Sequence, residues 1–375
     1  MPSSRSATRI STNSRCSPDL LKPMRLAICP YMLRFRQPAG TSRGVLRQKP
    51  TYLLKLYDEH HPEIYGLGEA AVFPGLSPEA DSRYEYKLIE LLANIAIGRP
   101  TDLSRHSSIQ FGLEQALRDF ASGGRHLYFP SPFIKGESEI EINGLVWMGS
   151  YEEMLDRLEE KLRQGFRCIK IKIGAIDIES ELSLIRRIRE KHSPEEIMIR
   201  VDANGGFTPD NVFPVLDQLA ALGVHSIEQP IPPGLGEAMR DVCKRSPVPV
   251  ALDEELIGVY DMEGRKRLLD ALGPAYIILK PALCGGFSGG EQWIEAAGEQ
   301  GVGWWITSAL ESNVGLDAIA QWTASLDAKG AQGLGTGALY TNNFTMPLSL
   351  QGDRLRYLPE EKIDSAQFDS LDWKE

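Results

Sequence analysis

The chain has 375 residues, of which 42% are hydrophobic and 25% are charged, a composition typical of a globular protein with one large domain or a large and a small one. The formal net charge of −10 argues against nucleic acid or an anionic membrane surface as a partner, because both favour basic proteins. No apolar run approaches the roughly 18 residues that a membrane-spanning helix needs. We therefore expect a small molecule as the partner, with the oligomeric state left open between a monomer and a homo-oligomer.

The first 23 residues differ from the rest of the chain. They are rich in Ser and Arg, contain one acidic residue, Asp19, and lack the apolar core of a secretory signal. We expect a disordered extension over 1–23, with an organellar transit peptide as the alternative, and a folded part that begins at Met24.

The cysteines are irregularly spaced and form no CxxC pair, which disfavours a structural zinc site or a disulfide framework. This usage fits a reducing compartment, and we expect the cytoplasm. The cysteines are Cys16, Cys29, Cys168, Cys243 and Cys284.

Residues 24–125 read as a mixed α+β unit. Runs rich in Leu, Ile and Tyr predict strands, and apolar residues at helical spacing predict helices. The expected elements are strands 24–35 and 51–58, a Gly-containing loop over 36–46, and helices within 81–98 and 111–122.

From about residue 142, short apolar strands alternate with amphipathic helices such as 151–164 and 178–192, which is typical of parallel βαβ units. The expected strands are 145–149, 168–173, 197–203, 225–229, 249–254, 276–281, 303–308 and 332–336. This order predicts an α/β fold, a (β/α)7β TIM-type barrel over 142–346, with the tail 347–375 packed on the N-terminal unit. An open doubly wound sheet is the alternative, but it would carry a Gly-rich fingerprint after its first strand, and none is present.

Charged residues stand at or near the C-terminal ends of five successive expected strands, where an apolar interior is the rule. They are Lys170 and Lys172, then Asp202, Glu228, Asp253 and Lys280. The steps from Lys172 onward are 30, 26, 25 and 27 residues, about one βα unit each. In a barrel, this spacing places all of these residues at the catalytic face.

Side-chain alternation predicts which way these residues point. In 168–173, isoleucines occupy one face and Lys170 and Lys172 the other, and the outer face of a barrel strand packs on helices. The lysines should therefore point inward. The same parity turns inward three polar residues of the next strand, Arg200, Asp202 and Asn204.

Strand order then predicts a chemistry. Asp202, Glu228 and Asp253 lie on neighbouring strands, about 4.8 Å apart, and can converge on one hard cation, Mg²⁺ with Mn²⁺ as an alternative. Lys172 and Lys280 lie on strands that are opposite in a ring of eight. Such a site suits removal of a proton beside a carboxylate, because a cation stabilises the resulting charge. A lysine can serve as the base if nearby cations and partial burial lower its pKa, and Lys170, Arg200 and the metal ion are the expected cations.

The segments IKIKIG, RVDANGG, IEQP, ALDE and LKP, in this order and spacing, resemble the enolase superfamily, and within it the muconate-lactonizing-enzyme group. The resemblance covers the barrel and the N-terminal unit, which is similar to that family's capping domain. It implies that Lys172 and Lys280 are the acid/base residues and that Lys170 tunes Lys172. It also implies an Mg²⁺ site formed by three carboxylates, Asp202, Glu228 and Asp253.

Within the group, 34–46 resembles the loop that caps the substrate in the o-succinylbenzoate synthases, and 307–316 resembles the end of their seventh strand. This resemblance implies a carbon–oxygen lyase of menaquinone biosynthesis that performs a syn dehydration. An N-acylamino-acid racemase, a dipeptide epimerase, a cycloisomerase and a non-catalytic binding barrel remain alternatives. The epimerases carry a DxD motif near the last strand, and 333–343 has no acidic residue.

Several further residues have two interpretations. Ser42 and Arg43 contact substrate or lie in a solvated loop. Ser308 and Glu311 contact substrate or form a capping box, since Ser precedes Glu by three residues. Asn204 supports the metal site or forms an Asx turn.

Overall fold

The computed structural model describes residues 24–41, 44–174 and 176–375. The expectations for 1–23 and for Ser42 and Arg43 therefore concern residues outside these ranges.

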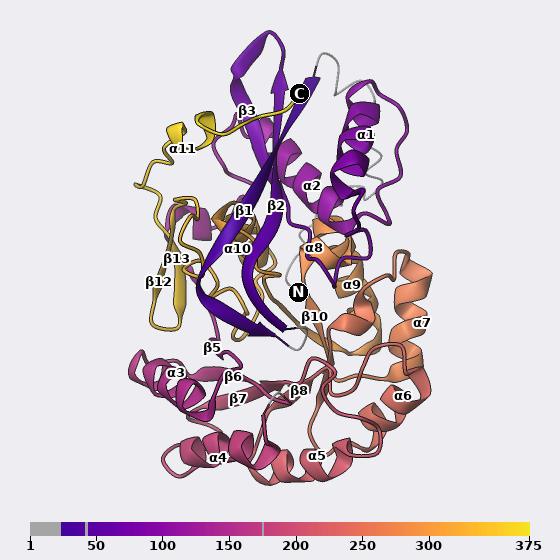
Figure 1. The fold of residues 1–375 in the computed structure, drawn as a ribbon, viewed down its shortest axis with the longest axis vertical. Helices are drawn as coiled ribbons and strands as arrows, with labels where there is room; N and C mark the ends of the chain where they lie inside the picture. The colour runs from indigo at the N-terminus through magenta and orange to yellow at the C-terminus, as the bar shows by residue number, and fades with distance from the viewer. Residues whose placement is uncertain (1–23, 42–43, 175) are drawn as a thin grey trace, which may run out of the picture.

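The N-terminal unit is an antiparallel sheet of three strands in the order β1-β2-β3, covered by two helices (Figure 1). Its elements are β1 (Met24–Thr41), β2 (Gly44–Asp58), β3 (His61–Ala70), α1 (Tyr84–Ala96) and α2 (Ser107–Ala121). Two glycines in β3 let α2 approach closely, since a Cβ on Gly68 would lie 2.0 Å from the carbonyl oxygen of Gly112. The sequence pattern missed β3, because this glycine-containing strand has exposed residues throughout its first half.

The expectation of a loop over 36–46 was wrong for most of this segment. β1 continues to Thr41, and β2 begins at Gly44, so that Ala39 pairs with Leu46 after an irregularity in the register that begins at Arg34. Strand pairing satisfies the backbone here despite a Gly- and Pro-containing sequence with low strand propensity. The hairpin reaches down to the barrel, where Arg36 N donates to the carbonyl oxygen of Leu339 over 2.8 Å (Figure 1).

Seven parallel strands form one curled sheet in the order β5-β6-β7-β8-β9-β10-β11. They are β5 (Gly144–Val146), β6 (Cys168–Lys172), β7 (Met198–Asp202), β8 (Ser226–Glu228), β9 (Val250–Leu252), β10 (Tyr276–Leu279) and β11 (Gly303–Ile306). Ile169, Ile171 and Ile173 are fully buried in the main core, as expected for side chains that face the outer helices.

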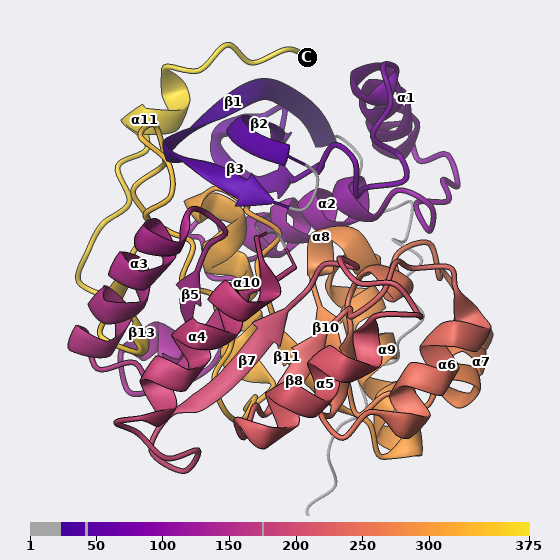
Figure 2. The same cartoon turned by 60° about the horizontal axis from the view of Figure 1, so that its bottom comes forward.

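Helices surround these strands (Figure 2). They are α3 (Tyr151–Arg163), α4 (Ile178–Arg189), α5 (Val212–Ala221), α6 (Gly236–Arg245), α7 (Met262–Leu272), α8 (Pro281–Cys284), α9 (Gly286–Gln300) and α10 (Asn313–Ser325). In α3, a capping box of Ser150 and Glu153 begins the helix, which buries Met154 and Leu158. None of the helices in the described ranges is both long and apolar enough to cross a membrane.

A very short eighth strand closes the ring. Gln332 forms a parallel bridge with Ile142, which precedes β5, and Gly333 forms one with Thr307, which follows β11. Because one segment bonds to both edges of the seven-stranded sheet, the open doubly wound sheet is excluded. The predicted (β/α)7β barrel with an α+β capping unit is confirmed.

The tail contacts both parts of the molecule. β12 (Leu348–Gln351) and β13 (Arg354–Tyr357) form a small antiparallel sheet with β4 (Glu139–Glu141). Beyond α11 (Ala366–Asp369), Lys374 bridges to Ile28 in β1. The last residues thus lie against the N-terminal sheet.

Candidate active site

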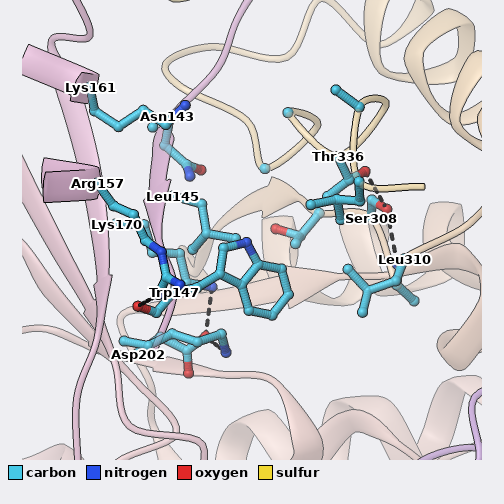
Figure 3. A pocket seen from close by; sticks show the side chains of 18 of the residues that line it. Asn143, Leu145, Trp147, Arg157, Lys161, Lys170, Asp202, Ser308, Leu310 and Thr336 are labelled. Atoms are coloured by element: carbon cyan, nitrogen blue, oxygen red, sulfur yellow. Dashed lines mark hydrogen bonds and ion pairs between the residues drawn. The ribbon is translucent and has the colours of Figure 1, made fainter. Parts of the chain in front are cut away.

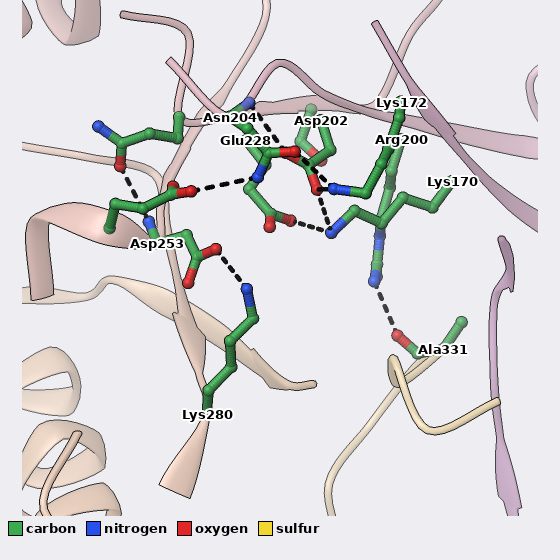
Figure 4. A network of polar contacts seen from close by, with 12 residues as sticks. Lys170, Lys172, Arg200, Asp202, Asn204, Glu228, Asp253, Lys280 and Ala331 are labelled. Atoms are coloured by element: carbon green, nitrogen blue, oxygen red, sulfur yellow. Dashed lines mark hydrogen bonds and ion pairs between the residues drawn. The ribbon is translucent and has the colours of Figure 1, made fainter. Parts of the chain in front are cut away.

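Six charged side chains from five consecutive strands meet inside the catalytic end of the barrel (Figure 4). The strand register aligns Lys172 with Asp202 and Asp202 with Glu228. Asp253 follows β9 directly, where the 3-10 helix η3 (Glu254–Leu256) begins, and Lys280 follows β10. The three carboxylates are at most 4% exposed. Sequence parity and spacing therefore located these side chains, although their roles are a separate question.

The three carboxylates form ion pairs with lysine ammonium groups. Lys170 Nζ lies 2.6 Å from Glu228 Oε2 and 3.0 Å from Asp202 Oδ2, and Lys172 Nζ lies 3.0 Å from the same Asp202 oxygen. Lys280 pairs with Asp253. Lys280 and the Lys170–Lys172 pair approach the carboxylates from different sides (Figure 4).

Burial, repulsion between carboxylates and attraction to lysines shift the carboxyl pKa values of this cluster in different directions. Burial raises the pKa of Glu228 to about 7, helped by the neighbouring charges of Asp202 and Asp253. Burial also raises the pKa of Asp253. For Asp202, burial acts in the same direction, but Lys170 and Lys172 outweigh it and lower the pKa well below its ordinary value. Three buried carboxylates on neighbouring strands thus hold more negative charge than this interior favours without cations.

For Lys280, burial disfavours the charged form, but Asp253 and Glu228 outweigh burial and raise the pKa. Lys170 behaves in the same way through Asp202 and Glu228. Both side chains are therefore held as ammonium groups by the carboxylates that they contact.

Asp202, Glu228 and Asp253 are the residues that could hold a metal ion. The described residues contain no group of three or more His, Cys, Asp or Glu side chains already arranged around one point. However, Glu228 Oε1 is buried and has no hydrogen-bond partner in the described part of the chain. An all-oxygen donor set with an unmatched buried carboxylate oxygen fits a hard divalent cation.

The cluster opens into a pocket of about 560 Å³ (Figure 3). Lys170, Lys172, Asp202 and Lys280 line it, together with Gln37 from the β1–β2 hairpin. The Lys172 ammonium lies 5.9 Å from the ring centre of Trp147. The segment that resembled a capping loop thus contributes to the pocket wall through a described residue.

The Asx turn here is formed by the side chain of Asp202 rather than by Asn204, and Asn204 contacts other residues of the site. Its backbone N–H donates to Asp202 Oδ1 over 3.1 Å, as in an Asx turn, and its side-chain oxygen accepts from Lys172 Nζ at 2.5 Å. Its Nδ2 donates to Glu254. Asn204 therefore holds the Lys172 amine in place.

Arg200 lies outside the pocket lining. It donates to the carbonyl oxygen of Ala331 over 2.7 Å and stacks 4.0 Å from the ring centre of Trp305. It thus supports the eighth strand from the layer beneath the cluster. Inward-pointing side chains of one barrel strand occupy more than one layer, so an inward side chain need not reach the catalytic cluster.

Ser308 lines the pocket, but Glu311 accepts its hydroxyl proton, with 2.6 Å between the oxygens. The capping-box interpretation was wrong, because α10 begins one residue after Ser312, whose side chain caps it instead. Thr336 donates in turn to Ser308. The hydroxyl groups of Ser308 and Thr336 are therefore engaged with protein partners.

Sequence reasoning missed several lining residues. Trp147 could have been predicted from side-chain alternation. It lies in the expected strand 145–149 on the same face as Leu145, which pairs with Lys170. Continued alternation along 249–254 would turn Glu254 outward, but the strand ends at Leu252 and η3 turns Glu254 into the pocket. Asn143 and Thr336 carried no signal that distinguished them from structural residues.

Comparisons with known proteins agree with this geometry. The family model described as "Enolase C-terminal domain-like" matches residues 153–358. An o-succinylbenzoate synthase from Desulfotalea psychrophila is 44% identical over an alignment of 357 residues, and the match covers 86% of this chain and 96% of that protein. The crystal structure of MenC from Desulfotalea psychrophila superposes with a TM-score of 0.79 and 40% identity, covering 89% of this chain and 99% of that chain.

A more distant structure shares the fold. The dipeptide epimerase from Cytophaga hutchinsonii, solved in complex with Mg and a dipeptide, has a TM-score of 0.77 at 18% identity and covers 93% of this chain and 98% of its own. At this identity, the likeness concerns the fold. The chain belongs to the enolase superfamily, in the family that includes the o-succinylbenzoate synthase of Desulfotalea psychrophila.

Proposed function

We propose that this protein is a carbon–oxygen lyase of the o-succinylbenzoate synthase type, which dehydrates a hydroxycyclohexadiene carboxylate in menaquinone biosynthesis. The observation that carries the proposal is that Lys172 and Lys280 line one pocket and form ion pairs with two buried carboxylates, Asp202 and Asp253. The 44% identity to an o-succinylbenzoate synthase supports the choice of substrate.

In this proposal, Lys172 Nζ removes the proton from the carbon beside the substrate carboxylate. The electron pair of the broken C–H bond forms a ring double bond as the C–O bond of the neighbouring hydroxyl breaks. Lys172 returns its proton to the departing hydroxyl on the same face, so that water leaves and the ring becomes aromatic. Lys280 remains an ammonium group and stabilises the negative charge that develops, or lies over the ring.

Asp202, Glu228 and Asp253 would hold Mg²⁺. When bound, a divalent cation supplies positive charge to the substrate carboxylate and so favours loss of the adjacent proton. Lys170 contacts Asp202 and Glu228, and its positive charge favours the ionised form of both carboxylates and orients them. Asn204 orients the Lys172 amine through its side-chain oxygen.

An isomerase is the second candidate, because two lysines on different sides of one pocket also suit a two-base racemisation. The stretch 333–343 argues against a dipeptide substrate, since it offers no carboxylate to an ammonium group. Solvent deuterium separates the two readings. A racemase would exchange the α-proton of an N-acylamino acid, whereas the dehydratase would leave it in place.

The decisive experiment is an ultraviolet assay with the hydroxycyclohexadiene carboxylate that precedes o-succinylbenzoate, in Mg²⁺ and then in EDTA. We expect fast aromatisation that EDTA abolishes and that added Mg²⁺ restores. Folded, Mg²⁺-supplied protein that fails to aromatise this compound would overturn the proposal. A panel of N-acylamino acids and dipeptides would then identify an isomerase.

A further inference from the structure

The pocket continues past the catalytic cluster through a gap in the barrel wall. Among the described residues, Asn143 N donates to Gln332 O over 2.9 Å and Gln332 N to Glu141 O over 2.8 Å, and no backbone hydrogen bond joins 144–147 to 334–338. The barrel ends on its eighth strand without a following helix. β5, the first strand of the barrel, and the short eighth strand therefore separate beyond Asn143, and side chains of α3 line the opening.

We call this extension the side arm. It is lined by Asn143 and Leu145 from the inner face of the first strand and by Arg157, Lys161 and Gln164 from or beside α3 (Figure 3). Leu350 in β12 and Gly352 in the turn that follows also belong to the pocket lining.

The side arm has unpaired positive charge. Each of the lysines in the catalytic cluster forms an ion pair with a carboxylate, whereas Arg157 and Lys161 form none within the described ranges. Arg157 donates to backbone carbonyls, and Lys161 Nζ donates to Gln164 over 3.1 Å. Glu160 is the acidic group at this end of the pocket, and its carboxylate accepts from Gln164 Nε2.

The side arm also contains an unsatisfied amide. Asn143 is 5% exposed, and its Oδ1 is buried without a hydrogen-bond partner among the residues that the structure describes. Leaving a buried polar atom unpaired is costly, so a polar partner from a ligand would be favoured. Because the oxygen and nitrogen of an amide are assigned from the hydrogen-bond network, Asn143 can present either atom to that partner.

Two hydroxyl groups of the opposite wall, those of Ser308 and Thr336, are poor donors to an anion. The Ser308 hydroxyl donates its hydrogen bond to Glu311, and the Thr336 hydroxyl donates its hydrogen bond to Ser308. Neither hydroxyl is therefore free to donate to a carboxylate. The catalytic carboxylates would repel a second anionic group. Thr307 Oγ1 is a further hydroxyl of the lining, buried without a hydrogen-bond partner among the described residues, but it carries no positive charge. The side arm, in contrast, combines a lysine that has no carboxylate partner in the described ranges with an unsatisfied amide, and it therefore suits an anion.

We propose that the side arm binds the distal carboxylate of the substrate, with the Asn143 amide as hydrogen-bond donor and Lys161 as counter-charge. This inference rests on the proposed function, since o-succinylbenzoate carries two carboxylates and only one of them is beside the reacting carbon. The second carboxylate, at the end of the succinyl chain, then lies away from Asp202, Glu228 and Asp253.

The test is direct binding, which does not depend on turnover. Calorimetric titration in Mg²⁺ compares o-succinylbenzoate with 2-butanoylbenzoate, which has the same chain length without the distal carboxylate. We expect wild-type protein to bind o-succinylbenzoate at least about tenfold more tightly, and Asn143→Leu and Lys161→Met each to remove most of that preference. Lys161→Arg should restore much of it. Lys329→Met, at a surface lysine paired with Asp327, should leave both affinities unchanged.

The outcomes separate this inference from the proposed function. Loss of the preference in Asn143→Leu and Lys161→Met supports the side arm, whether or not the ultraviolet assay detects dehydration. An unchanged preference in both folded variants overturns it, even if dehydration is fast. Failure of wild-type protein to bind o-succinylbenzoate, or equal affinity for the two ligands, also overturns it.

Discussion

Glu69 on β3 should hold the capping unit on the barrel. Its carboxylate accepts from Ser312 N at 2.9 Å, Ser312 Oγ at 2.6 Å and Gly315 N at 2.9 Å, all at the beginning of α10. Thr51 donates to the same carboxylate over 2.7 Å. Glu69 is fully buried, so Glu69→Ala would leave these donors without water to replace the lost acceptor.

The magnitude follows from the number and type of bonds. A hydrogen bond to a charged group contributes about 1.5–3 kcal/mol, and neighbouring bonds are not additive, so we expect Glu69→Ala to lower the free energy of unfolding by about 4–6 kcal/mol. At roughly 0.7 kcal/mol/K of unfolding entropy for a chain of this length, that loss lowers Tm by about 7 °C. Glu69→Gln keeps the shape and one acceptor oxygen, and it should lose about half as much.

Urea unfolding followed by fluorescence, together with a thermal melt, measures the loss. Glu63→Ala is the matched control, because Glu63 lies on the same strand with a side chain that is 67% exposed. We expect the control to change stability by less than about 0.5 kcal/mol. A loss below about 1 kcal/mol for Glu69→Ala would show that the contact between Glu69 and α10 contributes little to docking.

Three further predictions concern the site and the core. Lys172→Ala and Lys280→Ala should each lower kcat by about 10³-fold or more with unchanged circular dichroism and melting, and near-wild-type turnover in either variant would refute the two-lysine assignment. EDTA should abolish turnover and Mg²⁺ should restore it, whereas full activity in EDTA would contradict the assignment of the three carboxylates. Burial raises the pKa of Asp317 on α10 to about 7, so its stabilising contribution is complete below the unfolded pKa of about 4 and is lost as pH rises through about 7. Urea unfolding at pH 5 and pH 8 should show about 3 kcal/mol more loss in wild-type protein than in Asp317→Asn, and equal losses would refute this pKa.

Side-chain alternation and the spacing of βα units in the sequence were sufficient to predict the barrel and the position of its polar residues. Alternation in 168–173 turned Lys170 and Lys172 inward, and regular βα spacing brought Asp202 to the neighbouring strand. These inferences succeed because a strand has a side-chain period of two and because parallel strands present their carboxyl ends at one face.

The same rules failed where regular structure ends. Glu254 turned inward because a 3-10 helix replaces the strand after Leu252, which alternation cannot anticipate. The segment 36–46 became a hairpin because strand pairing outweighed local propensity. The Ser308 hydroxyl donates to Glu311 and is not free to donate to a ligand, and this hydrogen bond is evident only in the tertiary structure.

By itself, the sequence determined the order of the barrel strands, the inward face of two of them and the set of charged residues at their ends, since all three depend on neighbours within one βα unit. The tertiary structure decided which ammonium pairs with which carboxylate, where the barrel wall opens beside Asn143, and how the capping unit is held. Those features join residues distant in the chain, as Glu69 and Ser312 are joined across 243 positions. Such contacts depend on how completed elements pack, and no local periodicity encodes them.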